Sequence, residues 1–311
     1  MGERELVRYR SWVYDSARWG AVRLRPGDIV ISTPPKCGTT WTQMICVLLV
    51  HQRPDLGVPL SVLSPWVDML GTPIGEVVAT LEAQPHRRVI KTHTPLDGLP
   101  RGQDVTYICV ARDPRDTAIS MGGHRDNMDI ERFGSARAEV ATVDGEAGLP
   151  LPPAGQPALS ERERFWHWVD DVSPPTEAPS SLLRTLRHLE QFWEVRTEPG
   201  IVLLHYDDLS ADLEGEMRAL ADRLGIVAPE VRWPELVEAA GFAAMKRQAG
   251  ALAPTSMGRS FWRDPGQFFR LGTSGQWREL LDGDDLERYR RRVADLVPPD
   301  LATWAHGRAG L

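Results

Sequence analysis

In the stretch STPPKCGTTW, residues 32–41, two prolines are followed by one Lys, one Gly and two Thr, and a long apolar segment comes next. A loop that joins a strand to a helix presents free backbone N–H groups and the positive end of the helix dipole, so it can bind anions. Gly38 lets the backbone approach such an anion closely, and Thr39 and Thr40 add hydroxyl donors. Lys36 adds a mobile positive charge, but it stands before the Gly, and the Walker A pattern is absent from the chain. The stretch predicts an anion-binding loop, with an ordinary strand-to-helix turn as the alternative.

A second candidate pair, Lys91 and His93, stands at the end of the apolar run 86–93. Residues two apart on a strand point to the same side, and parallel sheets bind ligands at the carboxyl ends of their strands. A neutral histidine there is a natural general base near pH 7. Of 36 basic residues only three are Lys, and two of these fall in the two stretches described so far. The pairing of Lys with His favours a catalytic interpretation over a structural histidine.

Two stretches that contain arginine could complete an anion site. In VARDPRDTAIS, Arg112 follows a predicted strand and Ser120 lies eight residues later. An arginine fork and a serine hydroxyl can hold a phosphate together. In FFRLGTSGQW, Arg270 stands close to Gly272, a composition typical of loops that cradle anions. The alternative for the first of these stretches is a surface pattern of Arg–Asp ion pairs.

These residues need a scaffold that brings them together. Apolar, β-rich runs predict strands, and apolar residues at helical spacing predict helices. The predicted strands are 28–33, 86–93, 104–113 and the first part of 200–210, and the predicted helices are 38–52, a helix opened by Pro114, 181–197, 211–225 and 234–248. Alternating strands and helices form a mostly parallel, doubly wound sheet. We therefore predict a single α/β domain over residues 1–311, with a central, P-loop-like sheet flanked by helices.

Two segments depart from this regular pattern. Residues 134–160 are rich in Ala, Gly and Pro and are predicted to form a flexible insertion. Residues 250–275 have little periodicity and several Gly, which predicts a long loop across the surface. The aromatic run FWHW, residues 165–168, either belongs to a core helix or helps the insertion to shape a binding pocket.

Composition argues against several classes of function. A formal charge of −7 argues against nucleic acid as a partner, because nucleic-acid binding needs a basic face. No run of 18 apolar residues occurs, so no stable membrane span is expected, and the N-terminus lacks the apolar core of a secretion signal. The three cysteines form no disulfide framework and have no metal-ligand spacing. We therefore expect a cytoplasmic protein that uses no metal.

Together, the four motifs resemble those of the cytosolic-type sulfotransferases, which use 3′-phosphoadenosine 5′-phosphosulfate (PAPS) as sulfuryl donor. TPPKCGTTW resembles their 5′-phosphosulfate loop, IKTHTP their K-T-H-L-P strand, RDPRDTAIS their 3′-phosphate segment, and RLGTSGQW their C-terminal R-K-G-x-x-G-x-W motif. The matches follow the family's order and span residues 28–277. The resemblance implies the sulfotransferase fold and PAPS-dependent sulfuryl transfer to a hydroxyl group, by in-line displacement.

The resemblance also implies roles for individual residues. His93 would be the general base, and the other catalytic candidates would be Lys36, Lys91 and Ser120. The 5′ side of PAPS would bind to Lys36, Cys37, Gly38, Thr39 and Thr40, and the adenine would lie between Trp41 and Phe242, with Tyr206 and Met245 nearby. The 3′-phosphate would bind to Arg112, Ser120, Arg270, Leu271 and Gly272, and the 250–275 loop would cover the nucleotide.

The chain departs from the family pattern at a few positions. Cys37 stands where the family has Ser, which is compatible with binding if this position acts through its backbone N–H. Leu271 replaces a Lys and removes one charge near the 3′-phosphate. Ala240 and Gly241 stand where Thr-Ser is common, so one adenine hydrogen bond would be missing. The family's dimer motif is not visible, and both a monomer and a homodimer stay open.

The acceptor is predicted from likeness alone. VSPWVDML, GEVVATLEAQPHRR and KTHTPLDGLP resemble actinobacterial sulfotransferases assigned to glycolipids. A small-molecule or glycolipid hydroxyl is therefore the first expectation, and a phenol or another secondary metabolite is the second. Two other functions stay open: a P-loop-type, ATP-dependent kinase, which would need magnesium, and a non-catalytic module that binds 3′-phosphoadenosine 5′-phosphate (PAP). The presence of both Lys91 and His93 favours an enzyme, because binding alone needs no base.

Overall fold

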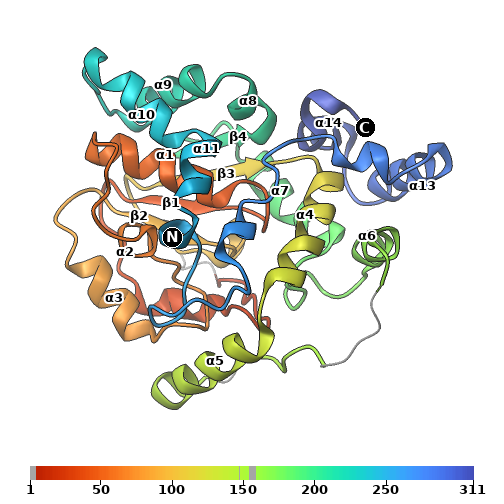
Figure 1. Cartoon of the computed structure of the whole chain (residues 1–311), viewed down its shortest axis with the longest axis horizontal. Helices are drawn as coiled ribbons and strands as arrows, with labels where there is room; N and C mark the ends of the chain where they lie inside the picture. Colours follow the sequence, from red (N-terminus) through yellow and green to blue (C-terminus); the bar gives the residue numbers. More distant parts are fainter. Residues whose placement is uncertain (1–4, 147, 154–158) are drawn as a thin grey trace.

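A computed structural model describes residues 5–146, 148–153 and 159–311 of the chain. At its centre lies a four-stranded parallel sheet with the strand order β2–β1–β3–β4 (Figure 1). The strands are β1 (Ile29–Ser32), β2 (Val89–Thr92), β3 (Thr106–Ala111) and β4 (Ile201–His205). Every residue of β1, β2 and β3 is buried, as expected for a parallel sheet that is covered on both faces. The predicted α/β fold with a central parallel sheet is confirmed.

Helices cover the two faces of the sheet in separate layers. One face carries α1 (Thr39–His51), α9 (Leu213–Leu224) and α10 (Trp233–Ala240), and the other carries α4 (Pro114–Asn127), α7 (Leu182–Glu194) and α14 (Pro299–His306) (Figure 1). Successive side chains of a strand point to opposite faces. Accordingly, Ile29 and Ile31 of β1 pack in the hydrophobic cluster with α1, α9 and α10. Val30 packs in the cluster on the other face, with α4, α7 and α14. The two clusters bury the sheet between them.

The remaining described helices are shorter or lie further from the sheet. They are η1 (Ser16–Ala21), α2 (Leu60–Leu63), α3 (Ile74–Glu82), η2 (Leu96–Gly98), α5 (Ile130–Asp144), α6 (Glu161–Asp170), α8 (Tyr206–Ala211), η3 (Glu230–Arg232), α11 (Phe242–Arg247), α12 (Ala249–Leu252), η4 (Pro265–Phe268), η5 (Gln276–Glu279), α13 (Gly283–Ala294) and η6 (Gly307–Ala309). Within the described ranges, no helix combines the length and the apolar character that a membrane crossing requires.

The helix predicted over 234–248 is wrong in one respect, because the structure divides it into α10 and α11. Gly241 lies between them with φ −63° and ψ 143°, an extended conformation that no α-helix continues. Its N–H still bonds to the Glu238 carbonyl oxygen at 3.1 Å, which closes the last turn of α10. The break turns the chain so that α11 begins at Phe242 beside the cavity described below.

The flexible insertion predicted over 134–160 is also wrong in its first part. Residues 134–144 belong to α5, whose N-cap Asp129 accepts a hydrogen bond from the Arg132 N–H at 3.0 Å. This part contains three Ala, one Arg and one Glu, which are good helix formers, and no Pro, whereas the prolines of the segment all follow residue 149. The average composition of residues 134–160 does not show this difference between the two parts of the segment. Residues 147 and 154–158 of the predicted insertion lie outside the described residues.

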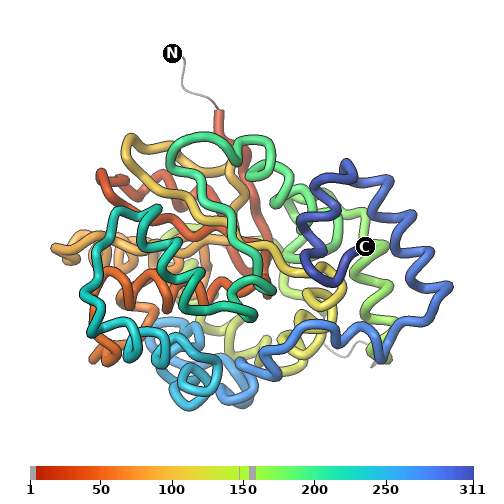
Figure 2. The backbone as a smooth tube through the Cα atoms, turned by 90° about the horizontal axis from the view of Figure 1, so that it is seen from above, coloured from red at the N-terminus to blue at the C-terminus, as the bar shows by residue number. Residues whose placement is uncertain are grey.

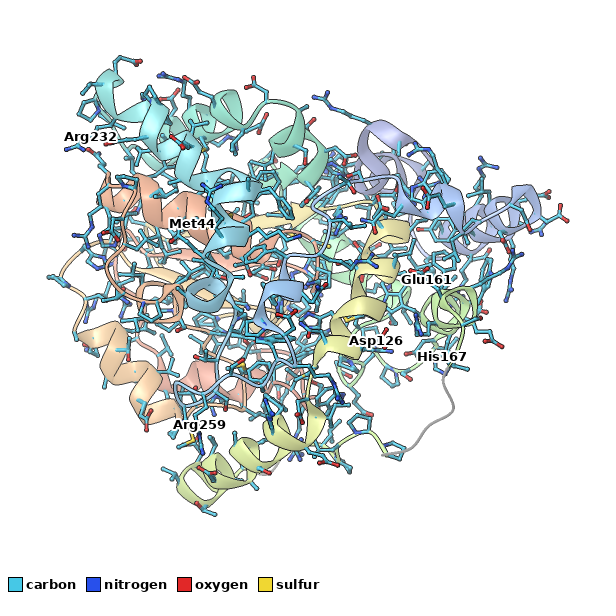
Figure 3. All side chains as sticks on the ribbon, viewed as in Figure 1. Met44, Asp126, Glu161, His167, Arg232 and Arg259 are labelled. Atoms are coloured by element: carbon cyan, nitrogen blue, oxygen red, sulfur yellow. The ribbon has the colours of Figure 1, made fainter. Side chains whose placement is uncertain are left out.

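The segment 250–275 is largely irregular and contains two short helical turns, α12 and η4. Figure 2 shows this light-blue segment running along one side of the molecule, from the end that carries α10 towards α13. The aromatic run at 165–168 belongs to α6, which packs against α4. Phe165 and Trp168 are buried in the core, and His167, labelled in Figure 3, lies at the outer edge of the molecule.

Candidate active site

A cavity opens at the carboxyl ends of β1, β2 and β3. It contains about 1600 Å³ of empty space, part of which is open to solvent. The predicted site residues that line it are Lys36, Gly38, Thr39, Thr40, Trp41, Lys91, His93, Arg112, Ser120, Tyr206, Phe242, Met245, Arg270, Leu271 and Gly272. The fold thus brings all four sequence motifs to one place.

The opening loop turns sharply before α1. Lys36 and Gly38 both have positive φ angles, 69° and 101°. At Gly38 a Cβ atom would lie 3.1 Å from the Tyr206 ring, so the turn and the close packing both favour glycine. The turn delivers Thr39 as the first residue of α1. Its hydroxyl lies 2.5 Å from that of Thr33 at the end of β1, which ties the strand to the helix N-terminus. The positive end of α1 therefore faces the cavity.

Cys37 is the predicted site residue whose side chain does not line the cavity. Its thiol is fully buried and lies 3.6 Å from the Thr117 hydroxyl of α4. Burial raises the pKa of the Cys37 thiol to about 11, so the side chain stays neutral. A ligand contact through this side chain is therefore not supported by the structure, and only the backbone of Cys37 remains available for one.

His93 follows β2 directly and presents its ring to the cavity. Its Nδ1 lies 2.7 Å from the carbonyl oxygen of Thr33, so Nδ1 carries the proton and donates it. In a neutral imidazole the other nitrogen, Nε2, is then unprotonated. Burial, and secondly the charge of Lys91, lower the pKa of His93 well below 6.5, which keeps the ring neutral near pH 7. Such a ring can accept a proton from a hydroxyl group.

Asp68, which the sequence analysis missed, fixes the chain around His93. Its Oδ2 accepts hydrogen bonds from the hydroxyls of Thr92 and Thr94, both at 2.6 Å, and from the His93 backbone N–H at 3.2 Å. Its Oδ1 accepts a hydrogen bond from the Trp66 indole N–H. Asp68 is fully buried, and these donors compensate the cost of placing a carboxylate there. No motif marks Asp68 in the sequence, since its partners are recognised only once β2 is in place.

Trp66 connects the two residues of the second motif. The Lys91 ammonium lies 3.8 Å from the centre of its ring, and the His93 ring meets it edge to face with centres 4.9 Å apart. A cation over an aromatic face is attracted to it. Because Asp68 holds the indole N–H, the ring gives Lys91 and His93 fixed positions relative to each other. Both line the cavity, as their spacing along the strand predicts.

Arg112 ties the opening loop to the C-terminal loop. It donates hydrogen bonds to the carbonyl oxygens of Lys36, at 3.2 Å, and of Thr273, at 3.0 Å. Its Nε is buried and has no hydrogen-bond partner among the described residues. Because Arg112 lines the cavity, this nitrogen leaves one strong donor for a bound anion. Ser120, on α4, lines the cavity as well.

The C-terminal loop is anchored by Asp116 of α4. Its carboxylate accepts hydrogen bonds from the backbone N–H groups of Gly275, at 2.7 Å, and Gln276, at 2.9 Å. Gly272, with φ 68°, packs so tightly that a Cβ atom would lie 2.4 Å from the Phe242 ring. This close approach explains the glycine in the motif. The loop thus lies against α11 and brings Arg270 to the cavity.

Aromatic rings line the cavity at two ends. Near the opening loop, the Trp41 indole N–H donates to the Ala240 carbonyl oxygen at 2.9 Å, and the ring meets Tyr206 edge to face at 5.2 Å. At the other end, aromatic and Met side chains that the sequence analysis missed line the cavity: Trp12, Tyr14, Trp66, Met69, Met121, Met128, Phe261, Trp262 and Phe268. Among the described residues, neither α5 nor the run at 165–168 contributes a lining residue, which favours the core-helix alternative for that run.

Sequence comparison identifies the family. The sulfotransferase domain family matches residues 26–297. The chain belongs to this family. A glycolipid sulfotransferase of Mycobacterium tuberculosis is 42% identical over 313 residues, which are 98% of this chain and 95% of that protein. Sulfotransferase 1A1 of Bos taurus is 25% identical over 263 residues, which are 82% of this chain and 78% of that protein. The predicted family and enzyme class are confirmed.

Solved structures share the fold of this sulfotransferase. Retinol dehydratase in complex with retinol and PAP has a TM-score of 0.67 and 20% identity, covering 92% of this chain and 87% of that chain. A mouse sulfotransferase complexed with PAP has a TM-score of 0.64 and 18% identity, covering 91% of this chain and 88% of that chain. At these identities the likeness concerns the fold alone. In the part of this sulfotransferase that the structure describes, no three His, Cys, Asp or Glu side chains are grouped to hold a metal ion.

Two lysines of this sulfotransferase lie in an environment that disfavours their charge. Burial, then the charges of Arg112 and Arg270, lower the pKa of Lys36 to about 7. Burial and the charge of Lys36 lower the pKa of Lys91 to about 7 as well. The positive charges gathered here have few partners in the protein itself. A site of this kind gains stability when an anion enters it.

Proposed function

We propose that this sulfotransferase transfers the sulfuryl group of PAPS to a hydroxyl group of a glycolipid-type acceptor, with His93 as general base. The observation that carries the proposal is the tautomer of His93, whose Nδ1 donates to Thr33 at 2.7 Å. Its Nε2 is thereby left to accept a proton in a cavity that Lys36 and Lys91 also line. The cytoplasmic location, the absence of a metal and the choice between monomer and homodimer stay predictions from the sequence.

The residues present fit PAPS at its anionic parts. The unpartnered Arg112 Nε, together with Arg270 and Ser120, offers donors for a 3′-phosphate. Gly38 and the N-terminus of α1 offer backbone N–H groups to a 5′-phosphosulfate, with Lys36 beside them. Leu271 stands where the family has a Lys, and its side chain is 54% exposed. A lysine at this position would therefore have a solvated charge.

The aromatic parts of the cavity fit an adenine. Trp41 and Phe242 both line the cavity and can stack on a base from two sides, as the family resemblance implies. The indole N–H of Trp41 is already used by the Ala240 carbonyl oxygen. Ala240 has no side-chain donor or acceptor, so the base receives contact area here and no additional hydrogen bond from that side chain.

The mechanism follows from the groups that surround the reacting atoms. PAPS supplies a sulfur atom bonded to a phosphate oxygen that can leave. His93 Nε2 takes the proton of the acceptor hydroxyl while the hydroxyl oxygen forms its bond to sulfur. Lys36 donates a hydrogen bond to the phosphate oxygen that keeps the electron pair of the broken bond to sulfur. Lys91, held over Trp66, stabilises the negative charge of the sulfuryl oxygens.

An amphiphilic acceptor suits the far end of the cavity. Its lining is mainly aromatic and Met, and the indole N–H groups of Trp66 and Trp262 already donate to Asp68 and to the Pro254 carbonyl oxygen. These indole N–H groups are therefore not free for the acceptor, and the aromatic and Met lining offers mainly apolar contact, which suits apolar chains. The relative from Mycobacterium tuberculosis is named a glycolipid sulfotransferase, which supports the same class. A phenol or another secondary metabolite is the second choice.

Radiolabelled PAPS, offered with panels of glycolipids, simple sugars and phenols, tests the proposed function. We expect labelled sulfate esters of the glycolipid panel in the absence of added metal. Labelled product from phenols alone would contradict the acceptor class but retain the reaction. PAP binding without product from any panel would favour the non-catalytic module, and phosphoryl transfer from ATP with magnesium would favour the kinase.

Binding of PAP is expected to take up protons at about pH 7.5. The pKa values of Lys36 and Lys91 are lowered to about 7 in the free protein, and a nearby phosphate raises them. A group whose pKa rises on binding favours binding at low pH, so affinity should fall from about pH 7 to 9, by up to about tenfold per pH unit for each lysine. Calorimetric titrations in two buffers of different ionisation enthalpy measure the uptake. Equal heats in both buffers together with a pH-independent affinity would contradict it.

A further inference from the structure

Lys36 has one side-chain hydrogen-bond partner among the described residues, and it comes from outside the four sequence motifs. The Lys36 Nζ atom lies 3.3 Å from Nδ1 of His124, which stands on α4 four residues after Ser120. His124 lines the cavity, as does Phe268, whose ring centre lies 4.8 Å from the same ammonium. The proposed mechanism uses Lys36 and leaves His124 without a function.

The chemistry of the contact fixes the tautomer of His124. When Lys36 is charged, its ammonium has donors and no acceptor, so Nδ1 of His124 is then the unprotonated nitrogen. Burial, and then the charges of Lys36 and Lys91, lower the pKa of His124 well below 6.5, so the ring is neutral near pH 7 and its proton is on Nε2. His93 has the opposite tautomer, with its proton on Nδ1. The two histidines are therefore chemically distinct at the same site.

The His124 ring is held by the C-terminal loop. The ring centres of Trp262 and Phe268 lie 4.8 Å and 6.0 Å from it. The same loop is joined to the end of α4 by the Asn127 side chain, which donates to the Asp264 carbonyl oxygen at 2.8 Å and accepts from the Asp264 N–H at 3.0 Å. The acceptor nitrogen of His124 thus has a fixed place, whereas the lysine chain that reaches it is long and flexible.

Every other titratable or charged group that faces this pair fails to provide Lys36 with an acceptor in the described structure. These groups are Arg112 after β3, Arg270 on the C-terminal loop, Lys91 and His93 at the end of β2, Cys37 in the opening loop and Arg125 on α4. Arg112, Arg270 and Lys91 repel the ammonium, and the Cys37 thiol is turned into the core. His124 offers the lone pair that compensates these repulsions.

We propose that His124 is a positioning residue for Lys36, whose ammonium it holds at the boundary between the anion-binding loop and the aromatic end of the cavity. The proposal rests on the proposed function, in which Lys36 acts on the leaving phosphate. A held ammonium starts near its working position, so less conformational entropy is lost when the nucleotide binds. Removing the lone pair releases Lys36 without touching the base.

A double-mutant cycle tests whether His124 acts through Lys36. His124→Phe keeps a ring against Trp262 and Phe268 but removes the acceptor, and His124→Asn returns an acceptor oxygen near the place of Nδ1. We expect His124→Phe to lower kcat about tenfold, as for the loss of one charge-assisted hydrogen bond. We expect His124→Asn to recover most of that loss. In a Lys36→Ala background, His124→Phe should then have no further effect.

The proposal would be overturned if the kcat losses of His124→Phe and Lys36→Ala multiplied in the double variant, or if His124→Asn did not recover kcat. His124 would then be a residue of the acceptor pocket. A second measurement needs no activity. The chain has three lysines, so ¹³Cε-lysine spectra contain three signals, which single substitutions assign. In the free protein, His124→Phe should lower the titration midpoint of Lys36 by about half to one pH unit, because the lost hydrogen bond favours the charged form. An unchanged midpoint would refute the contact itself, even if no sulfuryl transfer were found.

Discussion

Replacing His93 by alanine is expected to lower kcat by about 10²–10⁴-fold, the usual contribution of a general base. The variant loses the Nε2 lone pair that receives the acceptor proton. It also loses the hydrogen bond from Nδ1 to the Thr33 carbonyl oxygen, but Thr33 lies at the end of β1, whose ladder with β2 is unchanged. The affinity for PAP should change little, because Arg112, Arg270 and the N-terminus of α1 remain.

The measurement pairs initial rates with PAP titrations on the same preparations. His167→Ala is a matched control, since His167 lies on the outer edge of α6, away from the cavity lining (Figure 3). We expect the control to keep the activity of the unmodified enzyme. A His93→Ala enzyme with comparable kcat would refute the mechanism. A parallel loss of PAP affinity would instead indicate that the histidine is needed for the shape of the site.

The acid limb of the activity profile offers a further check on the same residue. Since burial and Lys91 lower the pKa of His93 well below 6.5, the base stays unprotonated until the pH falls well below that value. Activity that His93 limits should therefore persist at about pH 6.5 and fall only at lower pH.

The sheet and the anion site were predictable because they depend on local sequence. β1 and β3 are short apolar runs, and the anion-binding loop directly follows β1 just as Arg112 directly follows β3. Each strand and the ligand-binding residues after it can therefore be predicted from one continuous stretch of sequence. The parallel order then places Lys36, His93 and Arg112 at one edge, whatever the details of the helices. Gly272 was likewise found from its motif, whereas its packing against Phe242 is seen only in the structure.

The supporting residues could not be predicted in this way. Asp68 precedes β2 by about twenty residues and meets Thr92, Thr94 and the His93 N–H only after an irregular segment has crossed the strand end. Trp66 looks like any core aromatic until its face is found above Lys91. Their contacts are long-range in sequence, and no local periodicity carries information about them.

The predictions that failed share a different cause. The segment 134–160 was judged by its average composition, although its prolines lie in the second part and α5 occupies the first. For the run at 165–168 both a core helix and a part in the pocket were left open, and the core helix is found, because α6 directs these aromatic residues largely into the core. Composition describes a segment as a whole, whereas the direction of each side chain depends on the element that carries it.

Lys36→Ala is expected to lower kcat by about 10²–10³-fold, the cost of one donor that stabilises charge in the transition state. The charge on the leaving phosphate oxygen grows during the reaction, so a donor there stabilises the transition state more than the ground state. PAP affinity should fall far less, because Arg112 keeps its buried Nε for the anion and the backbone N–H groups of α1 are unchanged. The loss should appear in kcat rather than in KM for the nucleotide.

Lys36→Arg separates charge from position. A guanidinium keeps a positive charge but is planar and larger than the ammonium that fits between His124 Nδ1 and the Phe268 ring. We therefore expect Lys36→Arg to recover only a small part of the lost kcat. Arg291→Ala serves as a control for the removal of a positive charge, because Arg291 lies on the surface of α13 and pairs with Glu287. If Lys36→Arg were as active as the unmodified enzyme, a positive charge alone would be sufficient. The proposed contribution of the held ammonium and of its contact with His124 to kcat would then be refuted.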